Sequence, residues 1–281
     1  GLATTEHGES TGKLTELKLC LAARRRAGEP FDVVAVQETW LLGDDGLCVP
    51  GYEWRGRNRR RVHADASRGS GGVGFLIRRE LLAVVPISTM APTFGDCEGL
   101  LVLDLCTRCG FVRIINVYHE PARHCFPVDT PAFFAGIVTL LRQGPVGAGP
   151  RGFVCAVGDW NVRIGTKPDG GGAAGLGRRR GESTSGDGTT AFLGKIDASN
   201  ASGVQGRKCA WDWTFHPEHR QGRSVIDYCV VPCDQFAAVL DAGVAPRHVM
   251  DIASDHKLLW FGVSSPLAPL LACRVRSCVG P

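Results

Sequence analysis

The feature that most constrains this chain is a short apolar run, residues 154–157, which closes on Gly158 and is followed by Asp159 and Asn161. Four apolar residues ended by a glycine predict a buried strand that stops at a turn. On extended backbone, Asp159 and Asn161 lie two residues apart and project from the same face. A carboxylate and a carboxamide at the mouth of a sheet can hold and deprotonate a water, or bind a hard cation. For this motif alone, an Asx turn that caps the strand is the alternative.

Other predicted strands also end on polar residues or, in one case, contain one. The residues concerned are Gln37 and Glu38, Asn116 and Tyr118, Asp227 in the middle of the run 224–231, and Asp255 with His256. A buried carboxylate is costly unless it is paired or bound to a metal. Each residue taken singly is also compatible with an ordinary polar residue at the end of a strand. Only the combination of these residues indicates a functional site.

Composition allows one large domain or two small ones, because the 281 residues are 44% hydrophobic with a mean hydropathy near zero. The net charge is only +4, but arginines cluster at 24–26, 55–61 and 178–180. Clustered arginine suits phosphate, although solvated loops would also explain each cluster. Twelve cysteines without a signal peptide, and no apolar run of roughly 18 residues, predict an intracellular, reduced protein with no membrane span.

Five motifs in this order resemble the endonuclease/exonuclease/phosphatase superfamily, the DNase-like and apurinic-endonuclease-like fold, over about residues 12–263. They are Gln37-Glu38-Thr39, Asn116-Val117-Tyr118, Gly158-Asp159-Trp160-Asn161, Ile226-Asp227-Tyr228 and Ser254-Asp255-His256. Within the superfamily, the strings at 37–41 and 158–165 are most similar to the endonuclease domain of a non-LTR (LINE-type) retrotransposon. The second string is also similar to inositol polyphosphate 5-phosphatases, but those carry Trp-Cys-Asp-Arg where this chain has Val-Ile-Asp-Tyr at 225–228.

The resemblance implies an α/β fold: a four-layer sandwich of two mixed, mostly antiparallel sheets flanked by helices. It implies one domain over residues 1–263, and we expect a poorly ordered tail or linker over 264–281. The family's first strand carries a metal-contacting Asn just before a Gly-Leu, and this chain begins at Gly1-Leu2. That strand and its Asn are therefore expected to be missing, and a chain without them to bind metal weakly and nick slowly or not at all.

The resemblance also implies roles for the metal-binding and water-activating residues. Glu38 would hold Mg²⁺, with Mn²⁺ as the alternative, and Asp255 would assist the metal or the attacking water. Asp159 would orient or deprotonate that water, and Asn161 would fix its geometry.

Substrate contacts follow in the same way. His256 would contact the scissile phosphate, Asp227 would hold its ring in one tautomer, and Tyr118 would donate a hydrogen bond to the phosphate. The arginines expected to contact DNA by electrostatics are Arg55, Arg57, Arg59, Arg60 and Arg61. Family members often have Pro-Asn after the tyrosine, where this chain has His119-Glu120-Pro121, so no role is carried to those residues.

The function that these expectations favour is a Mg²⁺-dependent endonuclease that nicks DNA and leaves a 3′-hydroxyl, as the target-site nuclease of a retrotransposon. Its partners would be DNA and a reverse transcriptase domain in the same longer polyprotein, and its location the nucleus. One alternative is an abasic-site nuclease or a soluble-phosphoester phosphatase of the same superfamily. The other is an inactive domain that only binds nucleic acid, which the missing Asn would explain.

Overall fold

The computed structural model describes most of the chain from residue 12 onward. The described residues are 12–60, 69–95, 97–107, 110–120, 129–145, 152–161, 198–200, 227–232, 235, 238–244, 256, 258–263 and 274–278. They form two six-stranded sheets and three helices. None of these helices is both long enough and apolar enough to cross a membrane.

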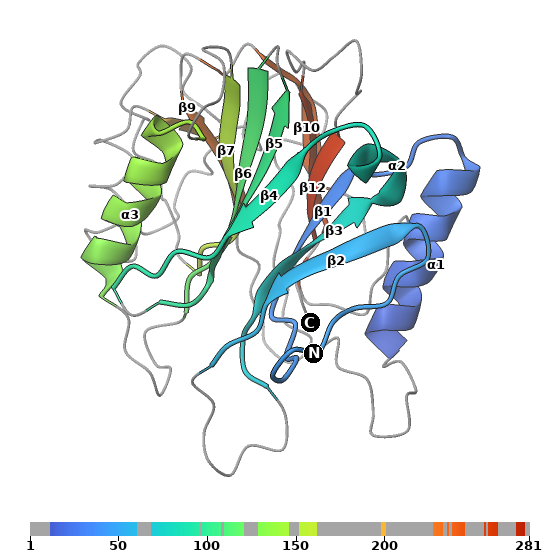
Figure 1. The fold of residues 1–281 in the computed structure, drawn as a ribbon, viewed down its shortest axis with the longest axis horizontal. Coiled ribbons are helices and arrows are strands. Elements are labelled where there is room, and N and C mark those ends of the chain that lie inside the picture. Colours follow the sequence, from blue (N-terminus) through green and yellow to red (C-terminus); the bar gives the residue numbers. More distant parts are fainter. Residues whose placement is uncertain are drawn as a thin grey trace, which may run out of the picture.

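Figure 1 shows four layers, with α1 on one side, two facing sheets in the middle and α3 on the other side. The first sheet has the order β10 (Val239–Val244), β11 (Leu259–Val263), β12 (Arg274–Cys278), β1 (Val33–Gln37), β3 (Val73–Arg78) and β2 (Tyr52–Arg57). The second sheet has the order β4 (Ile87–Met90), β5 (Leu100–Thr107), β6 (Gly110–Tyr118), β7 (Gly152–Asp159), β9 (Asp227–Pro232) and β8 (Ala198–Asn200). The helices are α1 (Gly12–Arg26), α2 (Arg79–Leu82) and α3 (Thr130–Arg142).

Most neighbouring strands are antiparallel, and the exceptions are β1 with β12 and β6 with β7. The parallel pair β6 and β7 needs a crossover, and α3 supplies it on the outer face of the second sheet. This arrangement confirms the predicted four-layer α/β sandwich of two mixed, mostly antiparallel sheets.

Apolar side chains fill three spaces between the layers. The central core lies between the two sheets, and Phe75 of β3 and Ile114 of β6 are both fully buried in it. On the outer side of the first sheet, α1 buries Leu14, Leu17 and Leu21, which recur at helical spacing. On the outer side of the second sheet, α3 buries seven residues of its thirteen against β5, β6, β7 and β9. Burial of these faces holds the strand ends in fixed positions.

The strand β12 lies between β11 and β1 and pairs in parallel with β1, Val33 opposite Val275. It lies inside residues 264–281, the stretch for which the sequence predicts a tail or linker, and Arg274–Cys278 within that stretch form a strand of the sheet. Arg274-Val275-Arg276 carries too little apolar residue to predict a strand from its own composition. The strand β12 pairs with the edges of β1 and β11, and these two strands are more than 200 residues apart in the sequence.

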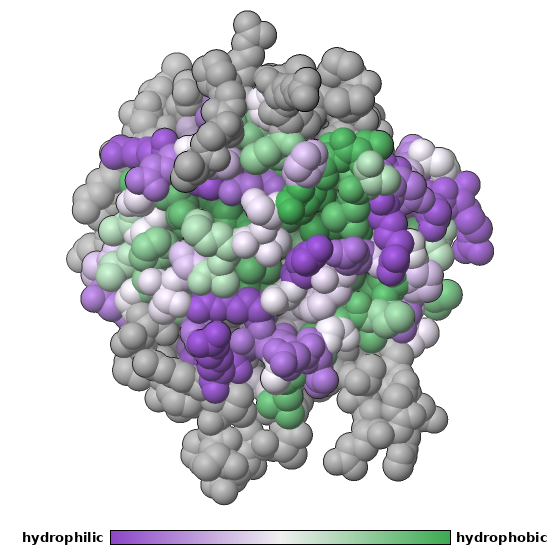
Figure 2. Space-filling model, in the orientation of Figure 1, coloured by the Kyte–Doolittle hydropathy of each residue, from purple (hydrophilic) through white to green (hydrophobic). Residues whose placement is uncertain are grey.

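Polar and apolar side chains are separated on the face seen in Figure 2. Hydrophobic side chains gather over the segment that runs from α2 into β4, and hydrophilic ones lie in the lower half of the described face, toward the end of β2. The lower edge is the polar end of the described face, and β1 and β2 both have their carboxyl ends on it, because Gln37 and Arg57 are paired with the same residue, Val73.

Candidate active site

Terminal residues of three strands form the floor of the site: the last residues of β6 and β7 and the first residue of β9. In the second sheet, Tyr118 at the end of β6 is in register with Asp159 at the end of β7. Asp159 is in turn opposite Asp227, the first residue of β9. Because β6 and β7 are parallel and β9 is antiparallel to β7, all three side chains belong to one edge of the sheet. The first sheet contributes Glu38, which follows β1 directly.

A buried amide bracket joins the two sheets beside this edge. The Gln37 Nε2 donates to Asn116 Oδ1 over 2.5 Å. The Asn116 Nδ2 donates to the carbonyl oxygens of Val36, at 3.0 Å, and Gly74, at 2.8 Å. Gln37 and Asn116 are fully buried, so these bonds are strong in the low local dielectric. The bracket therefore sets the position of Glu38 relative to the end of β6.

Glu38 is held by Tyr118, whose hydroxyl donates to Glu38 Oε1 over 2.5 Å. Burial, followed by the charge and hydrogen bond of Glu38, raises the pKa of Tyr118 above its ordinary value, so the phenol remains a donor. Glu38 has a φ of 51°, in the left-handed region that side chains avoid. Such strain is typical of functional sites, where the surrounding contacts fix the residue.

The Asp159–Asn161 pair forms a compact turn after β7, and Asn161 also has a left-handed φ, 47°. The Asn161 backbone N–H donates to Asp159 Oδ1 at 2.8 Å, and its Nδ2 donates to Asp159 Oδ2 at 3.0 Å. The same Nδ2 donates to the His119 carbonyl oxygen at 2.8 Å. Asn161 thus fixes the Asp159 carboxylate, as an Asx turn would, but at the edge where the other site residues gather.

Asp227 and His256 form a buried pair. The His256 Nδ1 lies 3.0 Å from Asp227 Oδ2 and 3.2 Å from Oδ1, and the Asp227 side chain is fully buried. Burial lowers the pKa of His256, but the charge and hydrogen bond of Asp227, followed by the charges of Asp159 and Glu38, raise it to about 9. The ring is therefore an imidazolium at neutral pH, with Nδ1 directed at Asp227.

The acidic side chains of this cluster could hold a cation. Oxygens of Asp159 and Asp227 and a ring nitrogen of His256 lie within 4.8 Å of one another. Burial raises the pKa of Asp159 well above its ordinary value, and the charge of Asp227 raises it further, as does that of Glu38. Two buried carboxylates, Asp159 and Asp227, with the partly buried Glu38 nearby, fit a hard divalent cation, which prefers carboxylate oxygen.

Six predicted site residues therefore come together, namely Glu38, Tyr118, Asp159, Asn161, Asp227 and His256. Asp255, predicted to assist the metal or water, and Arg61, predicted to contact DNA, lie outside the described residues.

The other predicted DNA contacts differ from one another. Arg55 is half-exposed and paired with Glu53 at 2.6 Å. Arg57 donates to the carbonyl oxygens of Pro92 and Leu100 and to Thr93 Oγ1, across to the other sheet. Arg60 is exposed.

The prediction for Arg59 needs correction. This residue is 5% exposed, and its Nη2 lies 2.6 Å from Glu120 Oε2 in a buried ion pair. A buried arginine already neutralised by a carboxylate presents little charge to a DNA backbone. We therefore remove Arg59 from the candidate DNA contacts.

Sequence reasoning gave no role to His119 and Glu120, and both support the site. The His119 backbone N–H donates to the Asp159 carbonyl oxygen at 2.9 Å, and its own carbonyl accepts from Asn161. Glu120 holds Arg59, which belongs to the other sheet's Arg-rich segment. The available signal was the departure from the family's Pro-Asn after the tyrosine, because a Glu beside a buried strand end needs a partner.

We expect the His119 ring to make stability pH-dependent. It packs against Phe133 and Phe134, and burial lowers its pKa to about 4. Since an unfolded histidine titrates near pH 6.5, the contribution of neutral His119 is complete above about pH 6.5 and is lost as the pH falls through 4. Wild type should lose about 2–3 kcal/mol of unfolding free energy through this group between pH 7 and 4. His119→Asn should show a flatter profile in urea unfolding, whereas equal slopes in the two proteins would contradict this.

The fold and the acid–histidine cluster define a phosphoester hydrolase of the DNase-like type, and the sequence comparison is more specific. Residues 13–256 match the Endonuclease/Exonuclease/phosphatase family, so the chain belongs to that family, whose members are nucleases and phosphatases that depend on divalent metal. No curated protein sequence matches the chain closely enough to count as a relative.

Several solved structures share the fold at low sequence identity. The AP endonuclease LMAP from Leishmania major has a TM-score of 0.60 at 17% identity, covering 88% of this chain and 82% of that one. The Xenopus laevis APE2 catalytic domain has a TM-score of 0.62 at 14% identity, covering 90% and 88%. The endonuclease domain of TRAS1, a telomere-specific non-LTR retrotransposon, has a TM-score of 0.53 at 13% identity, covering 88% and 91%.

Proposed function

We propose that this protein is a Mg²⁺-dependent endonuclease that nicks DNA and leaves a 3′-hydroxyl, as the target-site nuclease of a non-LTR retrotransposon. The observation that carries the proposal is the gathering of Glu38, Asp159, Asp227 and His256 where the two sheets adjoin, from three strand ends and a separate segment. The retrotransposon assignment rests on the motif strings at 37–41 and 158–165 and agrees with the likeness to TRAS1. A reverse transcriptase in the same polyprotein and a nuclear location are parts of the same proposal.

Two side chains of the protein take the main roles in the reaction: Asp159 as the base and His256 as the positively charged group. Asp159, whose pKa is raised, accepts a proton from the attacking water, and Asn161 holds the carboxylate in place. The water oxygen forms a bond to phosphorus, and the bond from phosphorus to the 3′ oxygen breaks, with the leaving oxygen taking up a proton from solvent water. This leaves a 3′-hydroxyl and a 5′-phosphate.

The positive charge of His256 faces the phosphate in this scheme. Asp227 holds Nδ1, so Nε2 is the ring nitrogen that can donate to a phosphate oxygen and stabilise the charge developing there. Tyr118 supplies a second, neutral donor. Glu38, with Asp255 assisting, would hold the Mg²⁺, which when bound acts as a Lewis acid on the phosphate oxygens.

The direct test is nicking of supercoiled plasmid with Mg²⁺, in the presence and absence of EDTA. Conversion to open circles that EDTA abolishes and excess Mg²⁺ restores is the expected result, because a carboxylate site of this charge needs its cation. The nicked plasmid should prime synthesis by a DNA polymerase without other treatment, which requires a 3′-hydroxyl. Nicking that persists in EDTA, or nicks that do not prime, would contradict the proposal.

A second candidate is an abasic-site nuclease or phosphatase with the same cluster. The likeness to AP endonucleases and to the Neisseria 3′ phosphatase NExo, at a TM-score of 0.54 and 17% identity, favours it. Cleavage of an oligonucleotide with one abasic site, or release of inorganic phosphate, without nicking of intact plasmid would select this candidate. A folded protein that binds DNA and shows none of these activities would select the inactive alternative.

A further inference from the structure

A groove of about 800 Å³ opens where the two sheets meet at the lower edge. Its lining comes from the loop after β1 (42–45), from the end of β2, and from Ala91 and Thr93, which follow β4 in the second sheet. The volume is sufficient for a nucleotide, since small-molecule sites typically have about 300–1,000 Å³.

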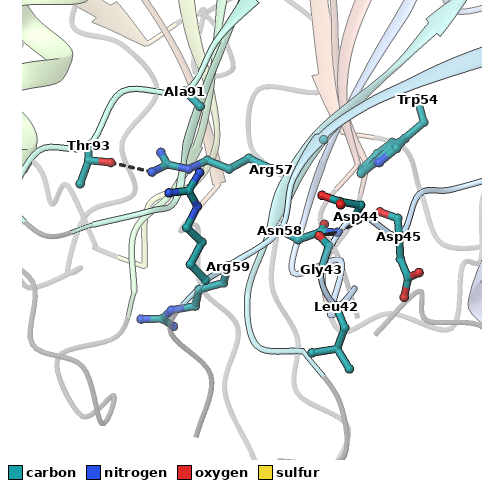
Figure 3. A pocket seen from close by; sticks show the side chains of 12 residues that line it. Leu42, Gly43, Asp44, Asp45, Trp54, Arg57, Asn58, Arg59, Ala91 and Thr93 are labelled. Carbon is teal, nitrogen blue, oxygen red and sulfur yellow. Dashed lines mark hydrogen bonds between the residues drawn. The ribbon is translucent and has the colours of Figure 1, made fainter.

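The two sides of the groove carry opposite charges. Figure 3 shows the Arg57 and Arg59 side chains on one side and Asp44, Asp45 and Trp54 on the other. Among the described residues, the carboxylates of Asp44 and Asp45 have no hydrogen-bond or ion-pair partner, although both are exposed. Arg60 also lines the groove, and its guanidinium likewise has no partner within the described part of the chain.

The acidic and aromatic side is preorganised. The Asn58 Nδ2 donates to the carbonyl oxygens of Gly43, at 2.9 Å, and Asp45, at 2.8 Å, and so anchors the loop. The Trp54 ring lies where a Cβ on Gly56 would come within 2.4 Å of it and one on Gly74 within 2.0 Å. Only glycine at these two positions allows the indole to lie against the strands, so Gly56 and Gly74 fix the position of the Trp54 ring.

The groove adjoins the catalytic cluster. Gln37, Val73 and Arg57 are paired across β1, β3 and β2, so Arg57 is two strands away from the residue that precedes Glu38. At about 4.8 Å between strands, the backbone separation is about 10 Å. A DNA strand whose phosphate lies at the cluster therefore reaches this groove within one or two nucleotides.

We propose that the groove binds one unpaired nucleotide of the DNA strand that is cut, and that it prefers bases with an exocyclic amino group; this rests on the proposed function. Arg60, supported by the positive charge of Arg57, contacts the phosphate, and the base stacks on Trp54. Asp44 and Asp45 accept hydrogen bonds from the amino group of cytosine or adenine, which thymine lacks. The carboxylates would repel a phosphate, so this side reads the base and not the backbone.

Binding in EDTA tests the inference without cleavage. The probes are fluorescein-labelled single strands of eight deoxycytidines, eight deoxyadenosines or eight thymidines, titrated with the whole chain. We expect oligo-dC and oligo-dA to bind on the order of tenfold more tightly than oligo-dT. Asp44→Asn/Asp45→Asn should shrink that ratio toward one, while Arg60→Gln weakens all three probes equally and lowers the salt dependence.

Glu80→Gln, an exposed carboxylate on α2, is the matched control and should leave the ratio unchanged. Quenching of tryptophan fluorescence by the probes should be reduced in Trp54→Leu. Equal binding of all three probes by wild type, or a ratio that survives in the Asp44/Asp45 double variant, overturns the inference. Plasmid nicking by the same preparations separates the two proposals. Nicking without any base preference in binding would contradict only the proposed nucleotide binding in the groove, whereas an absence of nicking would contradict the proposed function.

Discussion

Plasmid nicking by His256→Ala is expected to fall about 100- to 10,000-fold, because the substitution removes the imidazolium that faces the phosphate. Asp159→Asn is expected to fall by a similar factor, since an amide cannot accept the proton of the attacking water. Asp227→Asn should lose most of the activity as well, because the His256 Nδ1 loses the carboxylate at 3.0 Å that keeps its pKa near 9. Initial rates of open-circle formation under saturating Mg²⁺ measure all three.

The Asp227–His256 pair should behave as one unit. Asp227→Asn/His256→Ala should nick about as slowly as His256→Ala alone, because Asp227 acts through the ring it holds. Arg26→Ala, at the exposed end of α1, is the control and should nick like wild type. Wild-type rates in either single variant would indicate a contaminating nuclease, and losses that multiply in the double variant would show that the two residues act independently.

The second large effect concerns stability and the Arg59–Glu120 pair. Glu120→Gln should lower the unfolding free energy by about 3–5 kcal/mol, because it removes the Glu120 charge from beside the buried Arg59 guanidinium, which is 3% exposed. Arg59→Met/Glu120→Leu, which removes both charges, should recover most of the loss. Unfolding in urea, followed by circular dichroism, gives the free energies.

The chain offers a matched surface pair for comparison. Arg25 and Glu80 lie 2.7 Å apart with side chains 53% and 50% exposed, and Glu80→Gln should cost less than about 1 kcal/mol. A loss in Glu120→Gln as small as that in Glu80→Gln would show that Arg59 reaches water in solution. It would then return to the candidate DNA contacts.

Several residues of the candidate site were predictable because they are polar residues at strand ends. Asp159 follows a fully apolar run, and Glu38 follows β1, whose five residues are all buried. A carboxylate placed there must be paired or bind a cation, which is a local argument from burial. The pairing of Asp227 with Asp159 across β9 and β7 came only from the structure.

The roles of the arginines were not predictable in the same way. Composition shows five arginines between 55 and 61, and electrostatics alone treats them as equal. In the structure, Arg57 bridges the sheets, Arg59 is buried on Glu120, and Arg60 is exposed to a groove. The carboxylate that pairs with Arg59 belongs to Glu120, which is 61 positions away in the sequence.

The sequence by itself determined the family and the four-layer class, through the resemblance of its five motifs to a known superfamily. It also indicated the acid, amide and histidine side chains, because strand-end patterns are properties of neighbouring residues. Only the tertiary structure decided which side chains pair, where β12 lies, and that a groove with opposite charges adjoins the cluster. Those features depend on the register and facing of two sheets whose strands are far apart in the chain. Long-range pairing of this kind leaves no periodic signal in the residues that form it.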